Sequence, residues 1–198
     1  MSAPAPEPKS SWKPYVIGFL IGAVILTVLP FLQRAFLKAP APVRALAAWS
    51  APSLGGGEVS SAALSGQVLL LTLEAQACEA DCVERQTQFG TATRHVDDLG
   101  TVVLVSLVTD AAKPGLAALI EKAPAGWRFG TPSPELIAEL QTGLDTFLGG
   151  NNTDFSRAHA IVLIDQNNAL RGFWPNDGAG RGNSINAARL LAKHGPNP

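Results

Sequence analysis

Hydrophobic positions fall into one long stretch near the start of the 198-residue chain and several short stretches after it. Residues 15–32 read YVIGFLIGAVILTVLPFL, 18 positions without a charge, and basic residues flank them on both sides. A helix of this length rises about 27 Å, which approaches the roughly 30 Å of a bilayer's hydrocarbon core. We therefore expect one N-terminal transmembrane helix over residues 15–32. A cleaved signal peptide is the alternative, because residues 45–47 offer a small-x-small cleavage site.

The shorter apolar stretches beyond residue 53 follow two patterns. Continuous apolar runs predict buried strands, and apolar residues three or four apart predict helices. Strands are expected at residues 68–73, 101–108, 127–129, 160–164 and 170–174, and helices from residue 83, at 116–120, from 134 and at 183–193. The Asn167-Asn168 pair predicts a hairpin turn before the last strand. This alternation indicates an α/β fold whose sheet is covered by helices on both faces.

Composition divides the chain into four parts. Residues 1–14 are rich in proline, serine and alanine and are expected to be disordered. After the apolar stretch, residues 33–53 predict a Pro/Ala-rich linker, and residues 54–198 form the folded domain. Within that domain, the alternating glycines at 178, 180 and 182 lack the spacing of a dinucleotide fingerprint and predict a flexible loop.

The chain is nearly neutral overall, and its part beyond the apolar stretch is mildly acidic. The formal net charge of −1 gives no support for a nucleic-acid binder that neutralises phosphates. From Ala39 onward, 11 Lys and Arg stand against 15 Asp and Glu, so this part is mildly acidic. A short N-terminal tail and a first helix usually export the domain behind them, and a two-cysteine site suits an oxidising compartment. We expect the domain in the periplasm or extracytoplasmic space, although flanking positive charge leans slightly the other way.

The chain has only two cysteines, Cys78 and Cys82, directly after the first buried strand, where a helix should begin. Residues four apart share one helix face, near enough to bind one metal ion or, with adjustment, to form a disulfide. A disulfide closing so short a loop would add little stability, so we interpret the pair as functional. The helix start favours thiolates. The spacing leaves redox chemistry and metal binding both open, because a thioredoxin-type motif has two intervening residues instead of three.

Three histidines are candidates for a further ligand. His95 and His194 each end a predicted helix, where the helix dipole favours a histidine for structural reasons. His159 differs, because it directly precedes the buried strand at 160–164. Binding sites in open α/β sheets gather at strand ends, so position selects His159.

The order of these elements resembles the Sco/SenC family of membrane-anchored, thioredoxin-like copper chaperones. The similarity covers about residues 54–193, and its most specific element is the combination of Cys78, Cys82 and His159. The matching stretches are residues 64–71, 78–82, 105–110, 159–165 and 171–174. The chain resembles a divergent member: Glu79 and Val83 stand where the family typically has prolines, and Ala158 where an aspartate is common.

The resemblance implies a thioredoxin-like fold with a central mixed sheet flanked by helices, and copper held by Cys78, Cys82 and His159. Two thiolates and an imidazole suit Cu(I) and can hold Cu(II). It also implies that oxidation of the cysteines to a disulfide would abolish binding. Asp110 matches a family aspartate and is a further candidate near the site.

The function implied is delivery of copper to the copper-bearing subunit of a respiratory oxidase, or reduction of that site's thiols, with a thiol reductant as another partner. We therefore expect a metallochaperone rather than an enzyme. The first alternative is a membrane-anchored thiol-disulfide oxidoreductase that uses Cys78 and Cys82 without metal. The second is a thioredoxin-like binding module without catalytic activity.

Overall fold

The computed structural model describes residues 18–19, 22–24, 28, 39–55, 57–74, 82–94, 96, 100–109, 112, 115–149 and 159–195. The chain divides into two compact units, Met1–Lys38 and Ala39–Pro198. The tail predicted at 1–14 and most of the membrane segment predicted at 15–32 lie outside the described residues. Among the residues that are described, no helix combines the length and apolarity needed to cross a membrane.

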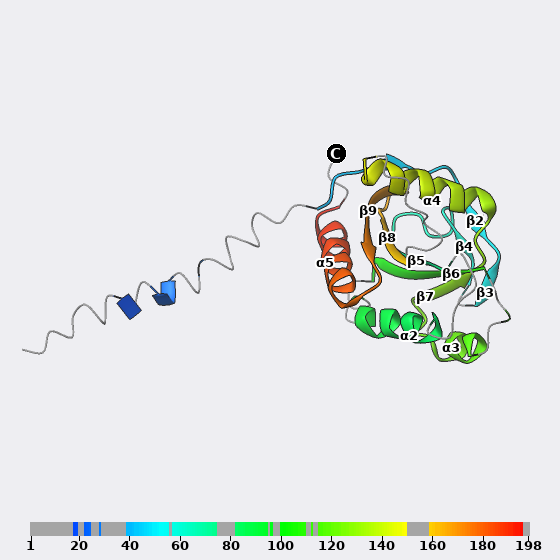
Figure 1. The fold of residues 1–198 in the computed structure, drawn as a ribbon, viewed down its shortest axis with the longest axis horizontal. Helices are drawn as coiled ribbons and strands as arrows, with labels where there is room; N and C mark the ends of the chain where they lie inside the picture. The colour runs from blue at the N-terminus through cyan, green and yellow to red at the C-terminus, as the bar shows by residue number, and fades with distance from the viewer. Residues whose placement is uncertain are drawn as a thin grey trace, which may run out of the picture. The chain divides into compact units, whose positions relative to one another are not determined.

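The second unit has the predicted α/β architecture (Figure 1). Its strands and helices are β1 (Arg44–Ala45), β2 (Ser50–Ala51), β3 (Ser53–Gly55), β4 (Val59–Ser60), β5 (Val68–Glu74), α2 (Cys82–Thr93), β6 (Val102–Val108), α3 (Leu116–Lys122), β7 (Trp127–Gly130), α4 (Pro134–Phe147), β8 (Ala160–Ile164), β9 (Ala169–Pro175) and α5 (Gly178–His194). The predicted strands and helices are thus all present, with ends that differ by a few residues.

The main sheet is mixed, as expected. In the described part of the unit it has seven strands in the order β1-β9-β8-β5-β6-β7-β3. Strands β5, β6 and β7 run parallel to one another, whereas β8 runs antiparallel to β5 and pairs with β9 through the predicted hairpin. Every residue of β6 and β8 is buried, which explains why β8 is an unbroken apolar run and β6 is apolar except for Ser106.

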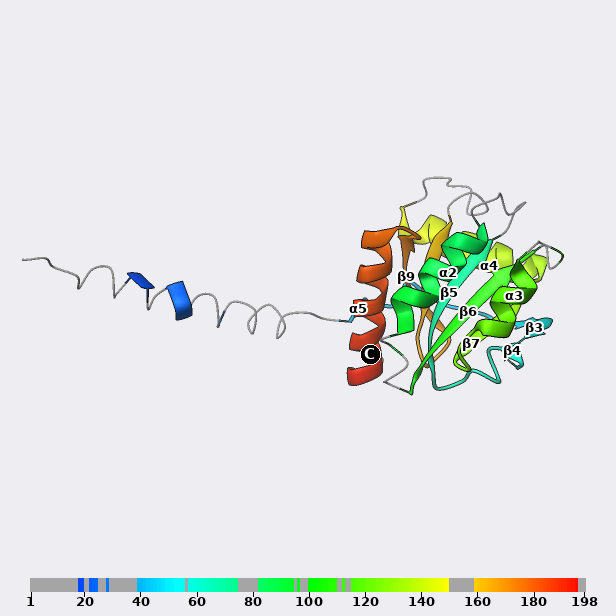
Figure 2. The same cartoon turned by 90° about the horizontal axis from the view of Figure 1, so that it is seen from below.

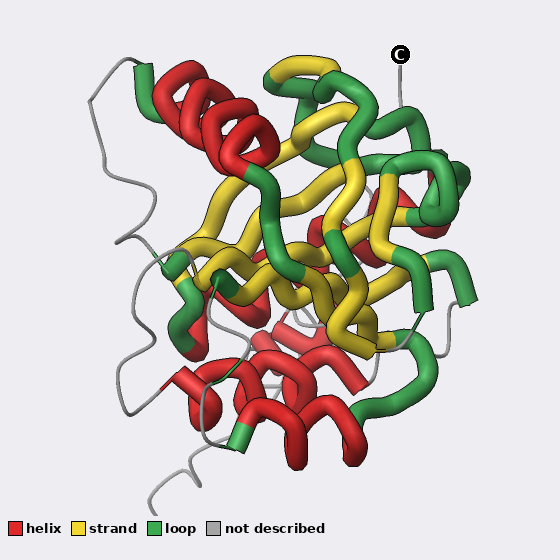
Figure 3. Tube along the Cα trace, turned by 90° about the vertical axis from the view of Figure 1, so that its right-hand side faces the viewer, coloured by secondary structure: helices red, strands yellow, loops and turns green. Residues whose placement is uncertain are grey.

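Helices cover both faces of this sheet (Figure 3). Alternate side chains of β5 point to opposite faces. Leu69, Leu71 and Leu73 belong to the core beneath α4, and Val68 and Leu70 belong to the core beneath α2, α3 and α5. Figure 2 shows α2 lying between α5 and α3 on their shared face, in agreement with the contacts of α2 with both helices.

Helix α4 begins as its sequence predicts. The Ser133 side chain accepts a hydrogen bond from the Leu136 N–H at 3.2 Å, and Pro134 occupies the first helical turn. Hydrogen bonds from its own backbone and from Ser133 hold the pKa of the exposed Glu135 carboxyl below its ordinary value. These local signals explain why the start of α4 could be predicted to the residue.

The linker predicted at 33–53 is wrong for its described part, because residues 39–53 belong to the folded unit. Strand β1 pairs with β9, and Leu46 and Trp49 are buried in the core beneath α4. The Trp49 indole N–H also donates to Asn168 Oδ1 at 2.9 Å. The prolines lie beside these short strands, so a proline-rich composition did not prevent strand pairing.

The flexible loop predicted at the alternating glycines is also wrong, because Gly178, Gly180 and Gly182 lie in the first turns of α5. Asp177 caps this helix by accepting a hydrogen bond from the Gly180 N–H at 2.7 Å. A Cβ atom at Gly180 would come within 1.9 Å of the Pro175 carbonyl oxygen. Glycine is therefore needed there for close packing of the helix against the end of β9.

Candidate functional site

Three strand ends meet at one edge of the sheet. β5 and β6 run in parallel with Glu74 opposite Val108, so both end there. β8 runs the other way, with Ile161 opposite Thr72, so His159 lies at the same edge. We call it the His159 edge. Helix α2 begins there too, because Gln86 in its second turn contacts Thr72 near the end of β5.

The predicted cysteine residues are described only in part. Cys82 is the first residue of α2, while its side chain and all of Cys78 lie outside the described residues, as do His95 and Asp110. The described helix therefore contains Cys82 but not Cys78, whereas the prediction of a shared helix face requires both cysteines in one helix. Among the residues that the structure does describe, no three His, Cys, Asp or Glu side chains are grouped to hold a metal. The ligand set remains a prediction.

His159 has the position that the prediction required. It is exposed, and it comes directly before β8. Its φ angle of 36° lies in the left-handed region, which is uncommon for residues other than glycine. Its carbonyl oxygen accepts a hydrogen bond from the Asn176 N–H at 2.9 Å, which fixes this turn against the end of β9. In contrast, His194 is the last residue of α5, where the helix dipole was expected to favour a histidine.

A buried polar network lies beneath the first turns of α2. Gln86 Oε1 accepts hydrogen bonds from the hydroxyls of Thr72 at 3.0 Å and Ser106 at 2.6 Å. The Trp127 indole N–H donates to Ser106 Oγ at 2.9 Å. Thr72, Gln86 and Ser106 are at most 1% exposed. Because buried polar groups are costly unless they are bonded, the network specifies how α2 sits on β5 and β6.

Sequence reasoning missed this network, although a signal was present. Thr72 and Ser106 are the polar interruptions in two apolar strands, and the strand register places them opposite each other. Gln86 lies one helical turn after Cys82 in α2. The network therefore holds the turn that carries Cys82 at a fixed position above the sheet.

The opposite edge of the sheet contains a buried ion pair. Arg171 donates from Nε to Asp165 Oδ2 at 2.6 Å, and both side chains are almost completely buried. Asp165 Oδ1 also accepts from the N–H groups of Asn167 and Ala169, each at 2.9 Å. Arg171 donates from a terminal nitrogen to the Pro40 carbonyl oxygen at 3.0 Å. We call this the Asp165 edge; its charged groups are engaged in holding the hairpin and the N-terminal segment together.

Comparisons with known proteins give fold similarity without sequence similarity. No protein-family model matches the chain, and no curated protein matches its sequence. Among solved structures, BsSco, a member of the Sco family of cytochrome c oxidase assembly proteins, is similar with a TM-score of 0.58 and 13% identity, over 80% of this chain and 99% of that chain. A SCO1/SenC family lipoprotein from Bacillus anthracis gives a TM-score of 0.54 and 14% identity, over 79% and 99%.

Thiol-disulfide oxidoreductases have the same fold. The thioredoxin domain of such an oxidoreductase from Bacteroides vulgatus gives a TM-score of 0.50 and 14% identity, over 77% of this chain and 99% of that domain. At these identities the likeness establishes the fold alone. The chain has a thioredoxin-like α/β fold, and its structural neighbours include Sco/SenC family proteins and thiol-disulfide oxidoreductases.

Proposed function

We propose that this protein is a copper-binding chaperone, with copper as its cargo, bound by the thiolates of Cys78 and Cys82 and the imidazole of His159. The observation that carries the proposal is the position of His159 at the edge where β5 ends and α2 begins. The chain connecting β5 to α2 contains Cys78, and Cys82 is the first residue of α2. This topology supports the proposal, because His159 and the start of α2 lie at one edge of the sheet although 77 positions separate His159 from Cys82.

The properties of the described residues suit a cargo site. His159 is exposed, so it lies at a surface that a metal ion and a receiving protein can reach. A helix start favours a thiolate in general, because the helix dipole and the free N–H groups of the first turn favour negative charge, and Cys82 is the first residue of α2. Thiolate and imidazole donors favour Cu(I) and also accept Cu(II). Oxidation of the cysteines would remove both sulfur donors, so a thiol reductant is part of the proposal.

We further propose that the receiver is the copper-bearing subunit of a respiratory oxidase, on the outer side of the cytoplasmic membrane. The structural likeness to Sco proteins, one of which is described as a cytochrome c oxidase assembly protein, supports this choice. The apolar stretch at 15–32 would be the anchor. Alkaline phosphatase fused after residue 198 should be active; an inactive fusion would contradict export.

A copper titration tests the ligand set. The full-length chain in a neutral detergent would be reduced and titrated anaerobically with Cu(I) against a chromogenic chelator. We expect one ion per chain, with affinity lowered by about tenfold or more in Cys78→Ser, Cys82→Ser and His159→Ala, because even outer-shell changes cost 10–100-fold. His194→Ala is the matched control and should bind as the unchanged chain does. Equal binding by the His159→Ala and His194→Ala variants would refute the proposed ligand.

A thiol-disulfide oxidoreductase without metal is the second candidate. It is favoured by the fold shared with the Bacteroides vulgatus oxidoreductase and by the position of Cys82 at a helix start. This candidate requires that Cu(I) binding be weak and that the Cys78–Cys82 dithiol be strongly oxidising when equilibrated with glutathione. A chain that neither binds Cu(I) nor exchanges disulfides would support the binding-module alternative.

A further inference from the structure

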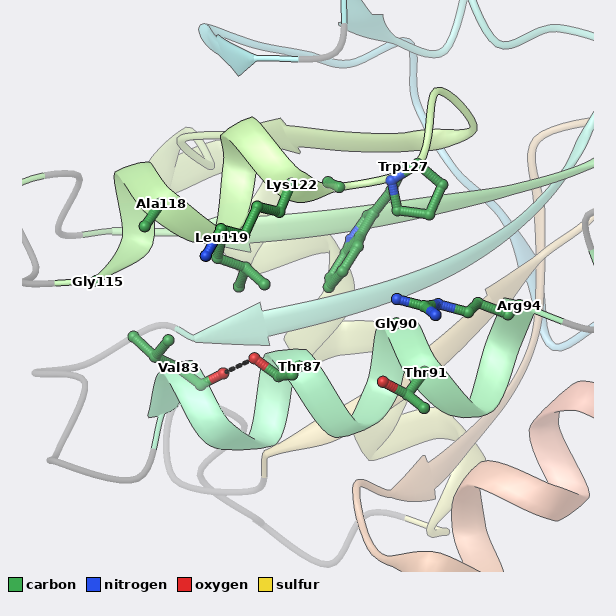
Figure 4. Close-up of a pocket in the computed structure, with 12 residues that line it drawn as sticks. Val83, Thr87, Gly90, Thr91, Arg94, Gly115, Ala118, Leu119, Lys122 and Trp127 are labelled. Carbon is green, nitrogen blue, oxygen red and sulfur yellow. Dashed lines mark hydrogen bonds between the residues drawn. The ribbon is translucent and has the colours of Figure 1, made fainter.

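A groove of about 360 Å³ runs between α2 and α3. Figure 4 shows Leu119 and Trp127 pointing from the α3 side toward Val83, Thr87 and Gly90 on α2. The floor is apolar, while exposed threonines lie along the α2 side. The groove is distinct from the proposed ligand set, but it starts at Val83, the residue after Cys82.

Two glycines shape this groove. A Cβ atom at Gly90 would come within 2.1 Å of the Trp127 ring, so glycine lets the indole approach α2 this closely. Trp127 is 3% exposed and is fixed from below by its bond to Ser106. Gly115, with φ of 86°, turns the chain into α3 beside Val83. The floor is therefore rigid and does not depend on an occupant for its shape.

The charge of the groove is opposite to that of the unit around it. Residues 39–198 carry 11 Lys and Arg against 15 Asp and Glu. Among the described residues that line the groove, however, the charged ones are Arg94 and Lys122, both basic and both exposed. Within the described part of the chain, neither side chain forms an ion pair with a carboxylate. An occupant with carboxylates would be attracted to these two side chains.

The length of the groove indicates an extended peptide. From Val83 to Thr93, α2 rises about 15 Å, which matches about five residues of extended chain. A single small anion could contact one basic side chain but would leave the apolar floor uncovered. The chain's own N-terminal unit is a poor occupant, because residues 1–38 carry four Lys and Arg against one Glu.

We propose that the α2–α3 groove binds an extended acidic segment of the partner protein, with apolar side chains on Trp127 and Leu119 and carboxylates at Arg94 and Lys122. Because the groove starts beside Cys82, a bound segment would hold the neighbouring part of the partner next to the cysteine pair. The identity of this partner as a copper or disulfide acceptor rests on the proposed function. The binding of an acidic segment does not.

Peptide binding tests the groove directly. The full-length chain in neutral detergent would be titrated with fluorescein-labelled Asp-Leu-Asp-Leu-Asp, with fluorescence anisotropy as the readout. We expect saturable binding that weakens about tenfold in the Arg94→Glu/Lys122→Glu double variant, since each rim ion pair contributes up to about 1 kcal/mol and reversal adds repulsion. Ala118→Trp fills the groove from an exposed position on α3 and should abolish binding altogether.

The structure offers a matched control for the charge reversal. Lys122 and Lys193 both lie in the last turn of a helix, so Lys→Glu at either position loses the same helix-dipole interaction. Only Lys122 lines the groove, and Lys193→Glu should therefore bind the peptide normally. Circular dichroism would verify that each variant is folded.

The remaining outcomes separate this proposal from the others. Failure of the acidic peptide to bind, or equal binding by Lys122→Glu and Lys193→Glu, would overturn it. Equally tight binding of Lys-Leu-Lys-Leu-Lys, inorganic phosphate or vesicles of phosphatidylserine would do the same. The Cys78→Ser/Cys82→Ser variant should bind the peptide normally. If the unchanged chain binds the peptide but not Cu(I), the chaperone function alone is refuted. If it binds Cu(I) but not the peptide, the groove alone is refuted.

Discussion

The two ends of strand β8 have opposite properties. At the amino end, His159 is exposed and has a left-handed backbone. At the carboxyl end, Asp165 is 2% exposed, and its two oxygens accept hydrogen bonds from Arg171 and from two backbone N–H groups. Both residues belong to the stretch 159–165 that resembles the Sco family. The contrast indicates that Asp165 serves the fold, while His159 lies exposed at the candidate site.

The largest effect is expected from breaking the Asp165 edge. Arg171→Met leaves the Asp165 carboxylate buried without its partner and should lower the free energy of unfolding by about 3–5 kcal/mol. Urea denaturation followed by circular dichroism measures this change. In the double variant Asp165→Asn/Arg171→Met, the amide oxygen can still accept the two backbone N–H groups, so most of the loss should be recovered. A single variant as stable as the unchanged chain would show that this edge is not an anchor.

The His159 edge has its own anchor below the surface, and breaking it should cost less. Gln86→Leu removes the acceptor of two buried hydroxyls and should lower the free energy of unfolding by about 1–3 kcal/mol. Gln88→Leu is the matched control, because Gln88 is exposed on the same helix. The measurement is again urea denaturation. If both variants lose equally little, the network does not hold α2 on the sheet.

The difference between these two anchors also explains what the sequence could predict. Apolar runs and the Ser133-Pro134 helix start are local patterns, and they located the strands and the start of α4. Trp49 is buried among residues distant in sequence and bonds to Asn168, 119 positions away, so no local pattern predicts that the segment before β3 is folded. Thr72, Gln86 and Ser106 likewise meet only through strand register and helix packing. For the ligand set, position selected His159, but the local sequence left metal binding and redox chemistry open.

A smaller effect tests the backbone at the His159 edge. A left-handed conformation costs residues other than glycine about 1–2 kcal/mol, so His159→Gly should be more stable than His159→Ala by about 1 kcal/mol. At His194, the last residue of α5, the order should be reversed, because glycine in a helix is less stable than alanine, by at most about 0.5–1 kcal/mol at a helix end. Thermal or urea unfolding of the four variants gives both differences. The same order at both positions would contradict the contrast between them.

The smallest effect is expected from removing the His159 side chain. Because the imidazole is exposed, His159→Ala should change the free energy of unfolding by no more than about 0.5 kcal/mol, a small fraction of the loss expected for Arg171→Met. The same variant should lose Cu(I) affinity, and this combination separates a ligand from a structural residue. A loss of stability near that of Arg171→Met would instead make His159 part of the scaffold. Unfolding and copper titrations on one preparation would then distinguish the two roles, because a structural histidine changes both measurements and a cargo ligand changes only the second.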